Sequence, residues 1–263
     1  MKSLFVALLF ISNSCLAQYW MGEIQTGALN YNGDLKQHAL SVKGMRPSIG
    51  LNVKYNSNDF INFRAGISWG ILTASDKNNP SKDLRVRNLD FTSHILEVNV
   101  GAEANLLDPE NQLAYPYVHA GVGIFHFNPY SHDKDNKKTY LQPLGTEGQG
   151  LKQYPDRKKY SLTQFCIPLG FGMKWKYKKG MEISYEFGYR IIFTDYLDDV
   201  SKTYVDPGML EKEKGQKTAE MSYRRTDKTF SELGGARGNP DVKDSYFFNG
   251  VKLSFKLLKD KKD

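Results

Sequence analysis

The sequence predicts an all-β protein: an eight-stranded antiparallel transmembrane β-barrel with short periplasmic turns and long extracellular loops. Two observations predict this fold. Apolar and polar residues alternate over long stretches, and the connections between these stretches alternate strictly between short and long. A strand sends alternate side chains to opposite faces. Long alternation therefore gives one apolar face for lipid and one polar face for a barrel interior.

The clearest stretch is MEISYEFGYRIIF at 181–193. One parity is apolar and aromatic over its whole length, whereas the other carries Glu182, Glu186 and Arg190. A stretch of this length can cross a bilayer as a tilted strand, which needs roughly 9–11 residues. It is longer than the strand of about 5–6 residues that is usual in soluble proteins.

The N-terminal residues are typical of a secretion signal. Lys2 precedes an apolar core at 4–11, and the run Cys15-Leu16-Ala17 predicts cleavage before Gln18. We therefore expect a signal peptide at 1–17 and one outer-membrane barrel domain at 18–263. Cys15 leaves a lipoprotein anchor as an alternative, although the residues before it lack the aliphatic side chain of a lipobox.

Composition excludes several classes of protein. After cleavage Cys166 is the one remaining cysteine, so a disulfide framework is excluded. The formal net charge is +7, but the lysines are dispersed over many polar stretches. They make no single basic face, and nucleic acid is a poor candidate partner.

Strand periodicity appears in eight segments, which we expect to be the barrel strands. They are residues 19–31, 45–56, 60–73, 90–104, 115–127, 161–176, 181–193 and 244–257. The first is irregular because Gly22 and Gly27 interrupt it. In the others one parity is apolar, as in Ile49, Leu51, Val53 and Tyr55, or Ile61, Phe63, Ala65, Ile67, Trp69 and Ile71, or Phe165, Ile167, Leu169, Phe171, Met173 and Trp175.

The connections give the barrel its orientation. Short connections are expected at 57–59, 105–114 and 177–180, and longer ones at 32–44, 74–89, 128–160 and 194–243. This alternation is typical of bacterial outer-membrane barrels, in which the short turns are periplasmic. A soluble lipocalin-like barrel or sandwich is the alternative. It would have to bury charged side chains that need pairing.

The polar parities of the strands converge on the barrel interior. They predict an interior ion-pair network of Lys54, Arg64, Glu97, Glu103, Lys174, Glu182, Glu186 and Arg190, joined by Glu23 and Lys252. A structural role is favoured, because eight strands leave room for side chains but not for an aqueous channel. A narrow ion path is the sharper alternative.

Few residues are candidates for catalysis or for metal binding. Ser93 and His94 suggest the Ser and His of membrane enzymes that cut lipid A, but adjacent strand residues point to opposite faces. The acidic segment 195–206 contains Asp195, Asp198, Asp199 and Asp206, which could bind calcium. It lacks the spacing of an EF-hand, and a structured loop base is favoured. Residues 218–233 are expected to form a short helix. We expect no catalytic residue, no metal and no cofactor.

Several stretches resemble a known family. They are LNYNGDL (29–35), PYVHAGVGIFHFNP (116–129), LQPLGTEGQGL (141–151), YSLTQFCIPLGFGMKWKY (160–177) and GYRIIFTDYLDDVSKTYVD (188–206). Together they resemble a Bacteroidetes family of small outer-membrane barrels that includes the PorG-type component of the type IX secretion system. The resemblance implies location in the cell outer membrane and contact with a periplasmic ring, built from a lipoprotein and its partner protein. It implies no catalytic residue.

The resemblance therefore predicts that the chain is a non-enzymatic accessory or anchoring component of the type IX secretion apparatus. Its partners would be outer-membrane lipid and the periplasmic ring. The longest periplasmic turn is the best candidate contact, through Asn105, Asp108, Pro109, Glu110 and Asn111. The main alternative is a surface-exposed adhesin or ligand-binding barrel that acts through its long extracellular loops. A membrane enzyme acting on lipid A is a third possibility.

Overall fold

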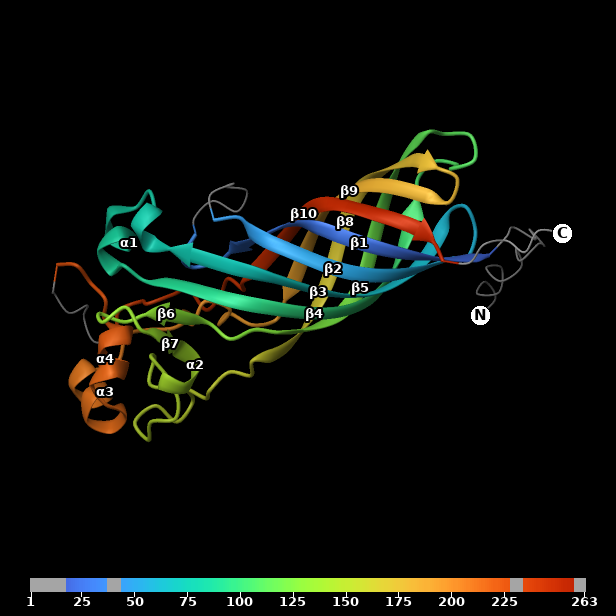
Figure 1. Ribbon diagram of the computed structural model, residues 1–263. Helices are drawn as coiled ribbons and strands as arrows, with labels where there is room; N and C mark the ends of the chain where they lie inside the picture. Colours follow the sequence, from blue (N-terminus) through green and yellow to red (C-terminus); the bar gives the residue numbers. More distant parts are fainter. Residues whose placement is uncertain (1–17, 37–43, 228–233, 258–263) are drawn as a thin grey trace, which may run out of the picture.

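Eight strands close into one antiparallel barrel in the computed structural model, which describes residues 18–36, 44–227 and 234–257 (Figure 1). The expected signal peptide at 1–17 lies outside the described residues. The barrel strands are β1 (Tyr19–Asn32), β2 (Arg46–Asn56), β3 (Ile61–Ser75), β4 (Asp90–Asn105), β5 (Ala114–His126), β8 (Thr163–Lys178), β9 (Met181–Ile192) and β10 (Ser245–Lys256). Pairing of β1 with β10 closes the sheet. The predicted fold class is confirmed.

Each strand lies where alternation predicted it, with ends that differ by two residues at most. One difference matters for function. Asn105 was expected in the periplasmic turn, but it is the last residue of β4 and is buried. Its amide donates to the Asp59 carbonyl at 2.7 Å, which draws it into the barrel mouth and out of the exposed turn.

The outer wall of the barrel is apolar and exposed. Leu51, Val98 and Val122 are 59, 52 and 60 % exposed, and similar residues on every strand continue the band around the wall. Soluble monomers rarely expose so large an apolar surface to water, whereas the lipid-facing wall of a membrane barrel is apolar. A closed sheet also leaves no unpaired edge in the bilayer. The chain is therefore a membrane-spanning barrel of the outer-membrane type, and the soluble alternative is wrong.

The two ends of the barrel differ strongly. The three short turns lie at one end together with Tyr19 and Lys256, while the long connections gather at the other (Figure 1). In outer-membrane barrels the end with short turns is periplasmic.

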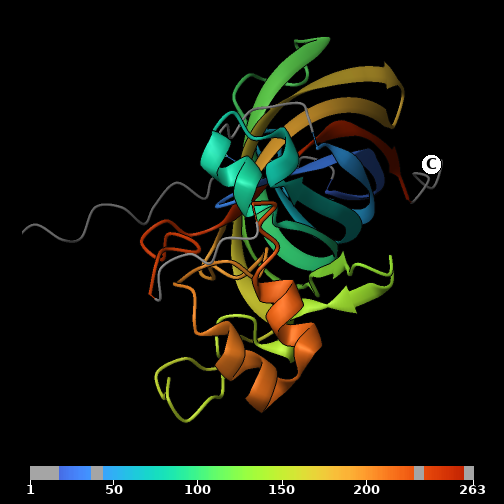
Figure 2. The same ribbon diagram turned by 90° about the vertical axis from the view of Figure 1, so that its left-hand side faces the viewer.

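The long connections are folded into a cap (Figure 2). The cap contains η1 (Asp76–Asn78), α1 (Lys82–Arg87), the hairpin β6 (Tyr130–His132) and β7 (Lys138–Tyr140), α2 (Leu141–Leu144), α3 (Pro207–Lys214) and α4 (Gln216–Ser222). Within the described ranges, none of these helices has the length and apolarity needed to cross a membrane.

The helix expected at 218–233 is only partly correct. Helix α4 starts at Gln216 and stops at Ser222, and residues 228–233 lie outside the described part of the chain. Helix α3 was not expected. It starts because the Asp206 side chain accepts a hydrogen bond from the Met209 amide, with Pro207 in the first turn.

One apolar core joins the barrel to the cap. Phe91, Phe125 and Tyr246 fill the interior nearest the cap, and Leu197 and Met221 of the cap pack against the same cluster. All five side chains are almost completely buried. This half of the barrel is therefore plugged by aromatic side chains, and the cap is held in place by a shared core.

A charge on the lipid face should destabilise the barrel. Val100, near the middle of β4, points to lipid and is 51 % exposed. Val100→Arg should lower the free energy of unfolding by about 2–4 kcal/mol, because the guanidinium must enter hydrocarbon. Urea unfolding in lipid vesicles measures this. Val242→Arg, at an exposed site outside the strands, is the control and should change little.

Candidate functional site

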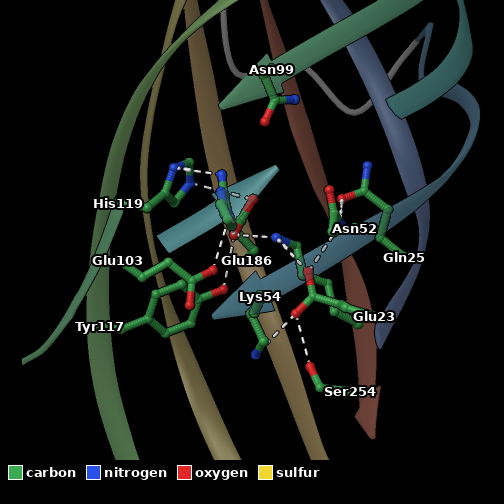
Figure 3. Close-up of polar contacts among 12 residues, drawn as sticks. Glu23, Gln25, Asn52, Lys54, Asn99, Glu103, Tyr117, His119, Glu186 and Ser254 are labelled. Carbon is green, nitrogen blue, oxygen red and sulfur yellow. Dashed lines mark hydrogen bonds and ion pairs between the residues drawn. The ribbon is translucent and has the colours of Figure 1, made fainter. Parts of the chain in front are cut away.

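Charged side chains fill the half of the barrel nearest the periplasm. Figure 3 shows the polar contacts around Glu186 inside the barrel. All of the side chains expected in the interior network face inward and are buried or nearly so; they are Lys54, Arg64, Glu97, Glu103, Lys174, Glu182, Glu186 and Arg190, with Glu23 and Lys252. Alternation places them there, because each lies on the parity opposite to the lipid-facing residues of its strand.

Glu186 on β9 is the centre of the network. Arg64 Nη1 on β3 donates to Glu186 Oε2 at 2.8 Å and to Glu103 Oε1 at 3.1 Å. Lys252 Nζ on β10 lies 2.5 Å from Glu186 Oε2, and His119 Nε2 on β5 lies 3.3 Å from Oε1. Side chains from five strands therefore converge on one point of the lumen.

The remaining charges pair around this centre. Lys174 Nζ lies 2.6 Å from Glu103 Oε2 and donates to the Asn105 side-chain oxygen at 3.1 Å. Lys54 Nζ lies between Glu23 and Glu182, at 3.2 and 3.5 Å.

Nearer the aromatic plug, Arg190 Nε donates to Glu97 Oε2 at 3.2 Å. In this network the carboxylates of Glu23, Glu97, Glu103, Glu182 and Glu186 face the cations of Lys54, Arg64, Lys174, Arg190 and Lys252. Five charges of each sign balance, as buried charge requires. The arrangement is that of a structural plug.

The sequence prediction missed the tyrosines of the network. Tyr117 OH donates to Glu186 Oε2 at 2.9 Å, Tyr115 OH to Glu182 Oε1 at 2.6 Å, and Tyr246 OH to Glu97 Oε2 at 2.7 Å. It also left out His119. The signal was present, because Tyr115, Tyr117 and His119 share the inward parity of β5. The predicted network was limited to side chains with a full charge, although a phenol beside a carboxylate is a donor.

The cap contains buried ion pairs of its own, Arg87 with Asp76 and Arg237 with Glu147. Arg237 Nη1 donates to Glu147 Oε1 at 3.0 Å, and Glu147 also accepts hydrogen bonds from the backbone amides of Ser201 and Lys202. This cluster joins segments 141–151 and 188–206, two of the stretches that carried the family resemblance. These two stretches therefore determine how the loops of the cap pack against each other.

The acidic segment does not gather into a cation site. Asp206 caps α3, while Asp199 accepts hydrogen bonds from Thr146 and Tyr160 at 2.6 and 2.8 Å. Asp198 accepts one from Tyr31 at 2.5 Å, and Asp195 is buried beside them. Within the described ranges, no group of three or more acidic, histidine or cysteine side chains has the arrangement of a metal site.

The Ser93 and His94 pair is divided between two faces of β4. Ser93 is buried and its hydroxyl accepts a hydrogen bond from the Asn128 amide at 3.0 Å. His94 lies on the outer wall and stacks on Trp69, with 5.6 Å between ring centroids. The two side chains cannot act on one substrate.

The periplasmic mouth carries a polar pocket of about 240 Å³, lined by Lys174 and Glu182 at its base and by Pro109 and Glu110 of the β4–β5 turn. Asp108 shapes this turn. Its carboxylate accepts from the Glu110 amide at 2.9 Å and from the Asn111 side chain at 2.6 Å. Four of the five residues expected to contact a partner thus lie on the exposed turn.

Comparison with known proteins gave a family and several structures. The family model described as "Domain of unknown function (DUF6089)" matches residues 2–206. No curated protein matches. Similar structures include Neisserial surface protein A (6 % identity, TM-score 0.45, 92 % of this chain and 100 % of that one). Ail of Yersinia pestis with a heparin analogue (10 %, 0.41, 91 % and 100 %) and OprG of Pseudomonas aeruginosa (11 %, 0.36, 90 % and 97 %) are also similar.

Removing the central cation should destabilise the barrel. Arg64→Met leaves the buried carboxylates of Glu103 and Glu186 short of one positive charge. The free energy of unfolding should fall by about 3–5 kcal/mol. Urea titration of the folded barrel measures this. Adding Glu186→Gln should recover part of the loss, since the charges balance again. Equal stability of Arg64→Met and the native chain would contradict the network's role.

The cap should loosen as pH rises. Burial raises the pKa of the Asp195 carboxyl from 3.8 to about 7, among Asp34, Glu147 and Lys243. Because the folded cap holds this proton more tightly than the unfolded chain, stability should fall between about pH 4 and pH 7. Hydrogen exchange of residues 194–205 measures it. Asp195→Asn should flatten this part of the profile, and an unchanged profile would contradict the assignment.

Proposed function

We propose that this chain, which belongs to the DUF6089 family, is a non-enzymatic structural barrel that anchors a periplasmic assembly to the outer membrane. More specifically, we propose an accessory component of the type IX secretion apparatus that contacts the periplasmic ring lipoprotein and its partner protein. The observation that carries the anchoring role is the β4–β5 turn. It presents a cluster of exposed leucines at the periplasmic end of a plugged barrel.

The plugged interior supports an anchoring role over transport. The ion-pair network and the aromatic core together occupy the lumen from the periplasmic mouth to the cap. Eight strands leave no aqueous path beyond the side chains themselves. A barrel of this kind acts through the surfaces at its two ends.

The β4–β5 turn is the apolar one of the three periplasmic turns. Leu106, Leu107 and Leu113 are 56, 46 and 74 % exposed. The other two turns are shorter and more polar: Ser57, Asn58 and Asp59 precede one exposed phenylalanine, Phe60, in the first, and Lys179 and Gly180 form the second. Exposed apolar clusters rimmed by polar residues mark protein contacts.

Hydrogen bonds also fix the conformation of this connection. The Leu106 amide donates to the Pro116 carbonyl at 2.9 Å, and Asp108 fixes the bend through the hydrogen bonds described above. A preorganised turn loses little entropy on binding. A partner could therefore pack on the leucines and place a polar side chain in the adjacent pocket. The type IX assignment itself is supported by the resemblance of the five sequence stretches.

A second candidate function is an adhesin or ligand-binding barrel that acts through the cap. The observation in its favour is that the cap is folded. It has a small apolar core of Leu151, Val205 and Leu210, and a buried ion pair between Arg237 and Glu147. Folded loops present a defined surface to the exterior, as recognition requires. The separation of Ser93 from His94 argues against the lipid A enzyme.

Polar substitution of the turn should break the periplasmic contact. The triple variant Leu106→Ser, Leu107→Ser, Leu113→Ser removes the apolar cluster, and recovery of ring lipoprotein and partner with the tagged barrel should fall at least tenfold. Secretion of type IX substrates should fall with it. Heat-shifted migration on gels verifies that the barrel still folds.

The control for this experiment is Val242→Ser, an exposed apolar site at the opposite end of the barrel. Full co-purification by the triple variant would overturn the anchoring proposal. Loss of surface attachment in cap variants, with secretion intact, would favour the adhesin instead.

A further inference from the structure

The β6–β7 hairpin continues the barrel wall beyond the rim. Tyr130 of β6 pairs with Thr92 of β4, Tyr140 of β7 pairs with Tyr130, and Lys138 pairs with His132. Residues directly opposite each other in antiparallel strands lie on the same face of the sheet. Thr92 has the lipid-facing parity of β4. The hairpin side chains paired with it therefore lie on the outward face as well.

These side chains form a continuous run of rings with the barrel wall. Trp69 stacks on His94 at 5.6 Å between centroids, and His94 stacks on Tyr130 at 6.1 Å. Tyr130 then contacts Tyr140 at 6.0 Å and His132 at 5.9 Å, both edge to face. We name this surface the outer ladder; its members are Trp69, His94, Tyr130, His132, Lys138 and Tyr140.

Lys138 places a positive charge on the outer ladder. Its ammonium lies 3.9 Å from the centroid of Tyr130 and 4.8 Å from that of Tyr140. The side chain is exposed. Across residues 18–36, 44–227 and 234–257, no carboxylate forms an ion pair with it. A cation held between two rings, without an anion, is preorganised for an external negative group.

The opposite face of the hairpin is already occupied. Ser131, Asp133 and Thr139 are buried there, and Lys217 of α4 forms an ion pair with Asp133 at 2.6 Å. The folded cap therefore covers one side of the hairpin and leaves the outer ladder open. In Figure 1 the hairpin lies between the barrel wall and the helices of the cap.

The height of the outer ladder relates it to the membrane. From Ile61 to Ile71, β3 advances ten residues. At ~3.3 Å per residue and a tilt of ~40°, this is about 25 Å along the membrane normal, the height of the apolar band in such barrels. Ile71 pairs with His94. His94 therefore lies at the outer edge of the hydrocarbon, and the hairpin lies at the level of the lipid headgroups.

We propose that the outer ladder binds the phosphorylated sugar headgroup of a glycolipid in the outer leaflet. Lys138 would bind the phosphate, and the exposed ring of Tyr140 would pack against the sugar. Aromatic side chains are enriched at this level of a membrane because their rings suit a boundary between apolar and wet surroundings. The ladder is continuous with the lipid-facing wall, so the same lipid can contact both. The proposal does not depend on the periplasmic contact.

The test is binding of purified lipid A to the full mature barrel in detergent micelles. Lipid A with its phosphates should bind at least about fivefold more tightly than the same lipid after enzymatic removal of phosphate, since one lysine near an anionic surface contributes about that factor. Lys138→Glu should abolish the difference. Lys137→Glu is the matched control, because it is exposed and adjacent but has the parity of the covered face.

Tyr140→Leu provides a second variant that keeps the charge and an apolar side chain but removes the ring. It should weaken binding of both lipid forms by a similar factor. Heat-shifted migration verifies folding of each variant. Equal binding of the two lipid forms by the native barrel, or equal losses in Lys138→Glu and Lys137→Glu, would overturn the proposal. Binding of a soluble anionic polysaccharide as tightly as lipid A would overturn it as well.

Discussion

The balance of charge inside the barrel is the constraint on which the rest of the structure depends. Lipid outside the wall requires apolar side chains there, so alternation sends the polar residues inward. The lumen is too narrow to hydrate them. Buried ions are tolerated only when they are paired and hydrogen-bonded. The convergence of Arg64, Lys252 and His119 on Glu186 meets this demand with side chains from separate strands, and it ties those strands together.

The lumen is divided into an ionic half and an aromatic half, and this division explains why the two ends of the barrel differ. Near the periplasm the filling is ionic and ends in a polar mouth beside a rigid turn. Near the cap it is aromatic, and Phe91, Phe125 and Tyr246 continue into the core of the long loops. Apolar burial is not directional, so loops packed on it gain stability that a polar rim would not supply. The cap is ordered because the plug beneath it is apolar.

Period-two alternation made the barrel strands, their inward charges and the separation of Ser93 from His94 predictable from sequence. It could not give the partners across the lumen, because these depend on how the sheet closes. The cap was less predictable still. Tyr31 donates to Asp198 over 167 residues of sequence, and Arg237 meets Glu147 over 90. No local pattern encodes such contacts. Asn105 was misplaced for a similar reason, since its partner Asp59 belongs to a different turn.

The barrel and one part of the cap neutralise buried charge in different ways. Inside the barrel, cations match carboxylates in number. In the cap, burial raises the pKa of the Asp198 and Asp244 carboxyls well above their ordinary range. The charge of Asp34 adds to this for Asp198, and the charges of Asp198 and Asp195 add to it for Asp244. Neither oxygen of Asp195 accepts a well-aligned hydrogen bond from a described residue. Protonation rather than ion pairing therefore neutralises these carboxyl groups of the cap. The barrel is stable over a wide range of pH by this argument, whereas order in the cap is conditional on protonation.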